Sequence, residues 1–337
     1  MKVAIKRPLF LFIVACFLSN QVIAESITLG GMQLKNITIK KPALYPESLK
    51  YDSKRDKFLV GSFRDGGVYE IDQNGNYRRL VDDERLISAL GILVDEQRNR
   101  LLVVSGDIGS SIRAYPKGIK KLAALGIYNL STGKALHFVN LGELLPQENH
   151  LANGLALDSE GNAYITDSFA PVIYKVNTEG KASVFLKSDR FKGKGINLNG
   201  IAFHPEGYLI VAKKSSGRLF KIPLTKPNDF SEIQLEEKLF GSDGVTLLNN
   251  NNVLIVANRA SGVNNEKAFI INSDDHWQSA SRIAEYSLGS VYPTTGVVRQ
   301  GKIYVLYSSL NILVTAAKEA KNSLRQRAII QQIGLIE

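Results

Sequence analysis

The strongest constraint on the fold is a phrase that recurs along the chain. Its clearest copy, residues 151–176, has a small or polar residue, a Gly, and then alternating apolar runs separated by turns. Such alternation, bounded by Gly, Asn and Asp, predicts three strands separated by two turns in each copy. We align the copies from Asn153 of this clearest one and call the residue at that aligned position in each copy its opener. The openers are Glu47, Leu90, Asn153, Asn199, Asp243 and Thr295.

The spacing of the copies selects the architecture. Successive openers are 43, 63, 46, 44 and 52 residues apart. Repeats of about 40 to 50 residues with several short strands each are typical of a β-propeller, in which four-stranded sheets surround a central channel. No Pro/Gly/Ser-rich linker interrupts the repeat, so one domain is favoured over two. The sequence therefore predicts an all-β fold: a six-bladed β-propeller with four-stranded antiparallel blades, spanning residues 25–337.

The first 24 residues have the layout of a signal peptide. Three basic residues precede an apolar run at 9–18, and a small-residue exit ends at Ala24. The run is too short to span a membrane comfortably as a helix. We expect cleavage after Ala24, a periplasmic or secreted protein, and no stable membrane insertion once the leader is removed. Two alternatives stay open: an uncleaved anchor, and a lipoprotein acylated at Cys16.

Charge and cysteine usage narrow the possible partners. The formal charge is +10, but the basic residues outside the leader are scattered through predicted turns. This pattern indicates a solvated surface, so we expect no nucleic-acid partner. The single cysteine, Cys16, lies in the leader, so the mature chain would contain no disulfide. The oligomeric state is left open.

Strand-like segments at both ends of the chain predict how the ring closes. Residues 25–41 alternate apolar and polar and read as one strand, and residues 327–335 read as another. An N-terminal strand that joins the last blade from outside would remove exposed sheet edges. We therefore expect both segments to contribute to closure.

The openers share a position but differ in chemistry. A residue that serves only its own blade should recur, as the turn Asp at 52, 95 and 158 does. In a propeller the openers lie at one mouth of the channel, so four of them would bring oxygen donors together: Glu47, Asn153, Asn199 and Asp243. Such donors suit Ca²⁺, or another divalent cation such as Zn²⁺ or Mn²⁺. A metal would also relieve the repulsion between the two carboxylates. The alternative is that these side chains simply meet water.

With these four residues in register, the chain resembles the gluconolactonase, regucalcin and senescence-marker family over about residues 42–311. More distantly it resembles the paraoxonases and the strictosidine-synthase-like propellers. The matching motifs are Pro46-Glu47-Ser48-Leu49, Ala152-Asn153-Gly154, Asn199-Gly200 and Ser242-Asp243-Gly244. The resemblance implies that Glu47, Asn199 and Asp243 bind a divalent metal, with Asn153 facing the substrate as a fourth oxygen donor.

The chain departs from the family pattern near the third opener. Leu151 stands where the sugar lactonases commonly have Arg, and Gly154 stands where an Asp often follows. These departures argue against a sugar lactone as substrate more than against the metal site.

The chemistry that the resemblance implies is hydrolysis of a lactone or related ester. The metal would polarise the carbonyl, and a carboxylate would deprotonate the attacking water. Asp243 is the expected base because it would contact both metal and water. Asn153 would orient the substrate. His150, three residues before Asn153, is a candidate proton shuttle, and the alternative for it is a histidine of the channel rim.

Two other functions stay open on the sequence. One is a non-enzymatic propeller that binds a protein or glycan ligand, since a fold does not fix a function. The other is a sugar-dehydrogenase-like propeller with a quinone cofactor, for which the chain shows no distinctive basic and histidine constellation.

Overall fold

The computed structural model describes residues 28–29, 32–259, 263–316, 324 and 326–336. The predicted leader, with Cys16, lies outside these residues. In the part of the chain that is described, no helix combines the length and apolarity needed to cross a bilayer.

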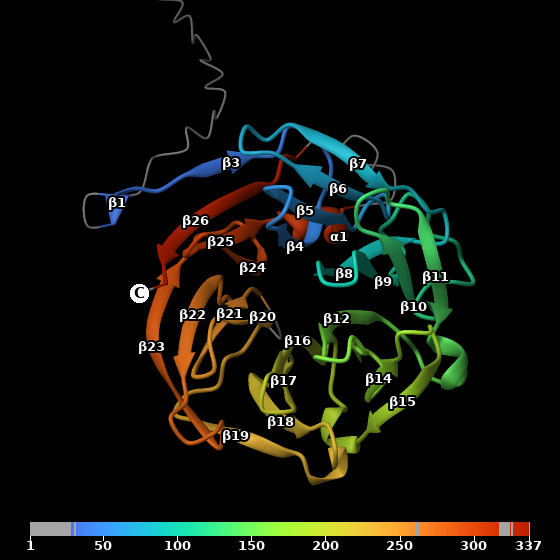
Figure 1. Ribbon diagram of the computed structural model, residues 1–337, viewed down its shortest axis with the longest axis vertical. Coiled ribbons are helices and arrows are strands. Elements are labelled where there is room, and N and C mark those ends of the chain that lie inside the picture. Colours follow the sequence, from blue (N-terminus) through green and yellow to red (C-terminus); the bar gives the residue numbers. More distant parts are fainter. Residues whose placement is uncertain (1–27, 30–31, 260–262, 317–323, 325, 337) are drawn as a thin grey trace, which may run out of the picture.

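The chain is all-β, as predicted, and Figure 1 shows its sheets arranged in a ring. Three sheets have four antiparallel strands in consecutive chain order. The first contains β4 (Pro46–Asp52), β5 (Lys57–Ser62), β6 (Val68–Ile71) and β7 (Tyr77–Val81). The second contains β8 (Ser88–Asp95), β9 (Arg100–Gly106), β10 (Ala123–Asn129) and β11 (Ala135–Asn140). The third contains β12 (Ala152–Leu157), β13 (Ala163–Asp167), β14 (Val172–Val176) and β15 (Ala182–Lys187).

The next two copies of the repeat form one eight-stranded sheet, where two separate four-stranded blades were expected. Its antiparallel halves are β16 (Leu198–His204), β17 (Tyr208–Lys213), β18 (Arg218–Pro223) and β19 (Ser231–Leu235), then β20 (Ser242–Leu247), β21 (Asn252–Ala257), β22 (Lys267–Asn272) and β23 (Ser279–Ser287). The halves are joined by a parallel pairing in which Gln234 lies opposite Ser279 and Leu235 opposite Ala280. The junction arises because the long outer strand β23 reaches the open edge of β19, and open edges tend to pair.

The last sheet closes the ring with strands from both ends of the chain. It contains β24 (Pro293–Arg299), β25 (Lys302–Tyr307), β26 (Ile329–Leu335) and β3 (Asn36–Thr38). Ile37 of β3 lies opposite Ile330 of β26 in an antiparallel pair, so the expected closure by both termini is confirmed. The N-terminal segment is not one strand, however: β1 (Thr28–Leu29) and β2 (Met32–Gln33) form a separate hairpin before β3.

The first strands of the six copies meet around the centre of the ring. In turn β4 contacts β8, β8 contacts β12, β12 contacts β16, β16 contacts β20, β20 contacts β24, and β24 contacts β4. The apolar core lies between the copies rather than at the centre, because each of six buried clusters draws on two successive copies. For example, Phe58 of β5 and Tyr304 of β25 stack edge to face with centroids 5.3 Å apart. The centre is thereby left for polar side chains.

Helical structure is sparse. The single α-helix of the described residues is α1 (Leu310–Thr315), and short 3₁₀ turns occur at η1 (Gly142–Leu144), η2 (Asp189–Phe191) and η3 (Pro227–Asp229). Leu310 and Leu313 of α1 pack in one apolar cluster with Tyr45, Leu90 and Leu151, which lie at or just before openers. The helix therefore covers the opener end of the ring.

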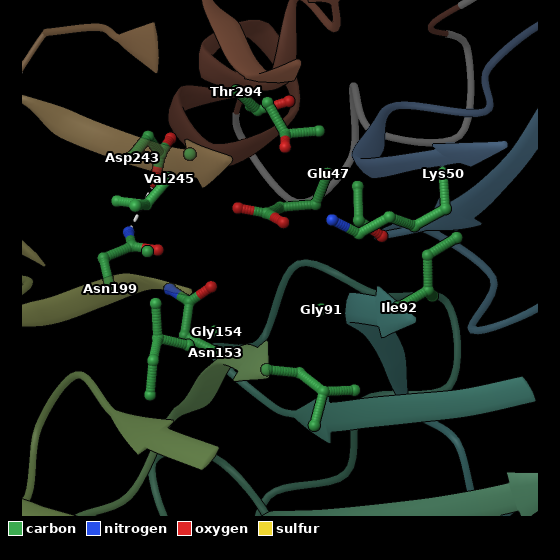
Figure 2. A pocket seen from close by; sticks show the side chains of 16 residues that line it. Glu47, Lys50, Gly91, Ile92, Asn153, Gly154, Asn199, Asp243, Val245 and Thr294 are labelled. Carbon is green, nitrogen blue, oxygen red and sulfur yellow. Dashed lines mark hydrogen bonds between the residues drawn. The ribbon is translucent and has the colours of Figure 1, made fainter. Parts of the chain in front are cut away.

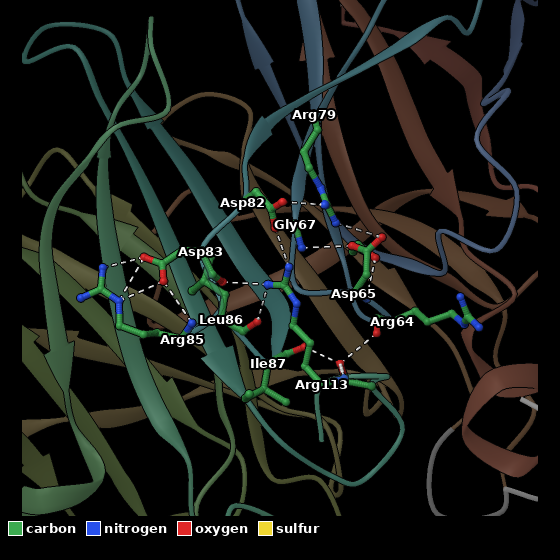
Figure 3. A network of polar contacts seen from close by, with 12 residues as sticks. Arg64, Asp65, Gly67, Arg79, Asp82, Asp83, Arg85, Leu86, Ile87 and Arg113 are labelled. Carbon is green, nitrogen blue, oxygen red and sulfur yellow. Dashed lines mark hydrogen bonds and ion pairs between the residues drawn. The ribbon is translucent and has the colours of Figure 1, made fainter. Parts of the chain in front are cut away.

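The 63-residue step in the repeat is explained by a loop between β9 and β10. In this loop, Arg113 donates to the carbonyl oxygens of Asp83 and Leu86 at 2.7 and 3.1 Å and pairs with the Asp82 carboxylate (Figure 3). Ser111 donates to the carbonyl of Arg64 at 2.8 Å. These bonds fasten the loop of the second sheet onto the first.

The terminal closure predicts a measurable loss of stability. Replacing Ile37 by Ala should lower the free energy of unfolding by about 2–4 kcal/mol, because it empties part of a buried cluster. The exposed neighbour Thr38 gives the matched control, Thr38→Ala, which should change it by less than about 0.5 kcal/mol. Urea unfolding followed by tryptophan fluorescence compares the two. Equal losses would contradict a closure through β3.

Candidate functional site

A β-bulge interrupts each of the six central strands at its opener. The pairing register shifts between Pro46 and Ser48 in β4 and between Ser242 and Gly244 in β20, and equivalent shifts occur in β8, β12, β16 and β24. A bulged residue leaves the ladder and its side chain is re-aimed. The bulges therefore allow the opener side chains to turn toward the centre.

Glycine follows most openers because neighbouring central strands approach very closely at this level. A Cβ atom added to Gly154 would lie 2.1 Å from the carbonyl oxygen of Asn199, and one added to Gly200 would lie 2.4 Å from that of Asp243. Any side chain at these positions would push the strands apart. The glycines of the repeat thus hold successive openers next to each other.

Five of the six openers line one small pocket, which we call the hub pocket. Glu47, Asn153, Asn199 and Asp243 reach it from β4, β12, β16 and β20, and Figure 2 shows their side chains around a common space. Thr295 also lines it, whereas the opener Leu90 is not in its lining and packs in the apolar cluster under α1. The cavity measures about 50 Å³, which is room for a few water molecules. The structure thus brings the predicted residues together, largely shielded from solvent.

Both carboxylate oxygens of Asp243 accept hydrogen bonds. The side-chain amide of Asn199 donates to Oδ1, and that of Asn258 donates to Oδ2. The ammonium of Lys214 lies 3.0 Å from the same Oδ2. Lys214 and Asp243 are buried together, with only 6% and 4% of their side chains exposed. Asp243 is therefore the acceptor of a buried polar network.

Lys214 and Asn258 were missed by the sequence analysis, although the repeat contains a signal for them. Each is the residue directly after the second strand of its copy, since β17 ends at Lys213 and β21 at Ala257. The equivalent residue after β13 is Ser168, whose hydroxyl accepts from the Asn153 amide at 3.1 Å. A second set of equivalent positions therefore supports the openers.

The charged side chains in and around the hub are the carboxylates of Glu47 and Asp243 and the amines of Lys214 and Lys50. Burial raises the pKa of Glu47 well above its usual range, the negative charge of Asp243 raises it further, and Lys214 counteracts both. Burial alone would lower the pKa of Lys214, but Asp243 foremost holds it above the usual value, so the amine is protonated. Lys50 also lines the pocket, and burial lowers its pKa.

The residues of the hub fit a divalent cation poorly. A cation beside Asp243 needs free oxygen lone pairs, but the Asp243 oxygens face two amide N–H groups and an ammonium. Within the described ranges, no group of three or more His, Cys, Asp or Glu side chains could hold a metal, but the predicted ligand set contains only two such residues and is not tested by this result. The predicted ligand set of Glu47, Asn153, Asn199 and Asp243 remains a hypothesis, and the Lys214–Asp243 ion pair argues against it.

His150 lies outside the lining of the hub pocket. Its Nδ1 is 2.8 Å from Asp167 Oδ2, and its Nε2 is 2.9 Å from the carbonyl oxygen of Leu145. Both partners are acceptors, so both ring nitrogens carry protons and the side chain is an imidazolium. The Asp167 carboxylate also accepts from the backbone N–H of Leu151 at 2.9 Å. This placement favours a structural ion pair that holds the chain leading to Asn153, rather than a proton shuttle.

Comparison with known proteins identifies the fold but not the family. No protein-family model matches the chain, and no curated protein sequence matches it. Among solved structures, the allergen Mala s 1 of Malassezia sympodialis is 17% identical with a TM-score of 0.69, over 88% of this chain and 95% of that one. A gluconolactonase of Xanthomonas campestris is 12% identical with a TM-score of 0.59, over 89% of each chain. Virginiamycin B lyase of Staphylococcus aureus is 10% identical with a TM-score of 0.54, over 89% and 99%. Gluconolactonases are thus among the structural relatives, and at these identities the likeness shows a shared β-propeller fold alone.

The His150–Asp167 pair predicts a stability that depends on pH. Replacing His150 by Gln should lower the free energy of unfolding by about 3 kcal/mol at pH 6, because it leaves a buried carboxylate without its cation. Burial lowers the pKa of His150, but Asp167 outweighs it, so the folded-state pKa is raised. The contribution is therefore complete below the unfolded-state pKa and is lost as pH rises through the folded-state value.

Urea unfolding of wild type and His150→Gln between pH 5.5 and 9 measures this dependence. The difference in the free energy of unfolding between wild type and His150→Gln should become smaller as pH rises. His137→Gln is the control, because that side chain is exposed. A difference that stays constant or grows with pH would contradict the imidazolium assignment.

Proposed function

We propose that the hub pocket is the active site of a hydrolase that acts on a lactone or related ester. The observation that carries the proposal is the convergence of Glu47, Asn153, Asn199 and Asp243, from four separate strands, on one largely buried pocket. The bulges and the glycines serve this convergence at a cost to regular strand pairing, as functional sites often do. The gluconolactonases among the similar structures support the same reading as an analogy of fold.

We further propose that the ring has six blades. The eight-stranded sheet then counts as two blades, because each half is a complete antiparallel run and the two meet through only a short parallel pairing. The unbroken circuit of contacts among β4, β8, β12, β16, β20 and β24 supports this count.

Glu47 is the better candidate for the general base. Asp243, the base expected from the family resemblance, has both oxygens engaged by Asn199, Asn258 and Lys214. Glu47 lines the same pocket, and no described residue donates a hydrogen bond to its carboxylate. A base must have a free lone pair within reach of the attacking water. Glu47 therefore takes the proton of the water, while Asp243 holds the surrounding donors in place.

Asn153 is assigned to substrate orientation. Its amide N–H is anchored on Ser168, whose own hydroxyl donates to the carbonyl of Leu198 at 2.6 Å. The carboxamide is thus held in one orientation, with its remaining groups available to the pocket that it lines. A side chain fixed by supporting hydrogen bonds positions a ligand more accurately than a free one.

Export of the protein is proposed from the sequence alone. The charged and apolar pattern of residues 1–24 supports cleavage after Ala24 and a periplasmic or secreted location. Acylation at Cys16 is the alternative. The N-terminal sequence of the mature protein distinguishes the two.

A hydrolysis assay tests the proposed reaction. The protein comprising residues 25–337 is incubated at neutral pH with a panel of aryl esters and lactones, aliphatic lactones included. Each assay is run with EDTA and with added Ca²⁺, Mn²⁺ or Zn²⁺. We expect turnover of at least one class. Glu47→Gln should lower kcat by about 100-fold or more, because the water loses its base. Glu160→Gln, at an exposed turn of the third sheet, should leave kcat unchanged.

Absence of turnover across the panel in every metal condition would refute the hydrolase. The non-enzymatic binding propeller would then be the better reading. Turnover that survives Glu47→Gln but not Asp243→Asn would return the base to Asp243.

A further inference from the structure

We propose that Lys214 is the resident cation of the hub. Its ammonium lies beside Asp243, the carboxylate predicted to hold a divalent metal, although Lys214 itself is not among the residues that line the hub pocket. The hub therefore works without a divalent metal.

The ion pair between Lys214 and Asp243 lies in the protein interior and not at the surface. Lys214 Nζ lies 3.0 Å from Asp243 Oδ2, and both side chains are more than nine-tenths buried. An ammonium at this depth requires an acceptor, and Asp243 supplies it. Removing either partner would leave the other as a buried, uncompensated charge.

The backbone of Lys214 is tied to the segments that lead into two openers. Its N–H donates to the carbonyl of Asn197, two residues before Asn199, at 2.8 Å. Its carbonyl accepts from the N–H of Gly241, two residues before Asp243, at 3.2 Å. The backbone of Lys214 is therefore held by the segments that lead into β16 and β20, and its ammonium is held by Asp243.

A divalent cation and this ammonium compete for the same oxygen. The amides of Asn199 and Asn258 could each turn an oxygen toward a metal, because a carboxamide has both donor and acceptor groups. A protonated lysine has no lone pair to offer. A metal next to Asp243 would also face a like charge in a poorly solvated pocket, where repulsion is strong. Lys214 must leave before a metal can bind.

The presence of Lys214 where a metal was predicted has a chemical consequence for the reaction. This consequence rests on the proposed hydrolase. Asp243 occupies part of the donor capacity of Lys214, and an ammonium has further N–H groups. In the proposed hydrolase, the oxyanion formed when water adds would then be stabilised by hydrogen-bond donors of the protein rather than by a metal.

Metal binding by the purified protein tests the inference without relying on activity. Wild-type protein, dialysed against EDTA and then buffer, is titrated calorimetrically with CaCl₂ and MnCl₂, and its melting temperature is recorded with each salt. We expect no stoichiometric binding and no shift in Tm. Lys214→Ser removes the charge and leaves space, so it should gain one-to-one binding of Ca²⁺ or Mn²⁺. Adding Asp243→Asn should abolish that gain.

Lys213→Ser is the matched control. Lys213 is the neighbouring lysine, but its ammonium donates to the carbonyls of Arg190 and Lys192, away from the hub. This variant should bind metal no better than wild type. Circular dichroism establishes that each variant is folded.

Two results would overturn the inference. One is stoichiometric metal binding by wild-type protein that is lost in Asp243→Asn, and this result decides the matter even if Lys214→Ser does not fold. The other is a folded Lys214→Ser that binds metal no better than wild type. Ester turnover that requires metal would refute the inference and keep the hydrolase, whereas a metal-free protein without turnover would keep the inference and refute the hydrolase.

Discussion

Two carboxylates are buried in one small pocket at the centre of the ring, and the surrounding structure must neutralise them. Asp243 is compensated by the ammonium of Lys214 and by the amides of Asn199 and Asn258. Glu47 has no such partner among the described residues, and burial foremost, followed by the negative charge of Asp243, raises its pKa. The two carboxylates therefore have different characters, one a fixed anion within a network and the other a free acid–base group. Environments that separate the behaviour of two like groups are typical of active sites.

The ring creates this situation through its geometry. Apolar residues pack between successive copies of the repeat, so the strands at the centre have no core of their own to fill. Bulges at the openers turn side chains inward, and glycines such as Gly154 and Gly200 allow the strands to approach until openers from different copies meet. Closure through β3 and β26 fixes the circumference, and with it the spacing of the openers. The geometry of the hub pocket therefore depends on the closure of the whole ring.

Much of this could be predicted from the sequence because the repeat makes equivalent positions comparable. The openers could be recognised because one position varied in chemistry while its surroundings did not. Closure by both termini followed from the strand-like pattern of the ends. The parallel pairing of Gln234 and Leu235 with β23 could not be foreseen, because it depends on how far an outer strand extends in space.

The site residues that the sequence analysis missed do not occupy the opener position, which was the position compared between copies. Lys214 and Asn258 follow the second strand of their copies. In a sequence, two adjacent lysines such as Lys213 and Lys214 indicate a solvent-exposed turn, and only the structure shows that the Lys214 side chain is buried. The position of His150, three residues before Asn153 in the chain, suggests a proton shuttle. Its partners, Asp167 and the carbonyl of Leu145, lie on other segments and became evident only in three dimensions.

The central claim is that the cation of the hub is a side chain and not a metal. A crystal soaked in Mn²⁺ and measured for anomalous scattering tests this most directly. The account predicts no anomalous peak among Glu47, Asn199 and Asp243, with the Lys214 ammonium within hydrogen-bonding distance of Asp243. A strong peak between these three side chains, with Lys214 turned away, would contradict it.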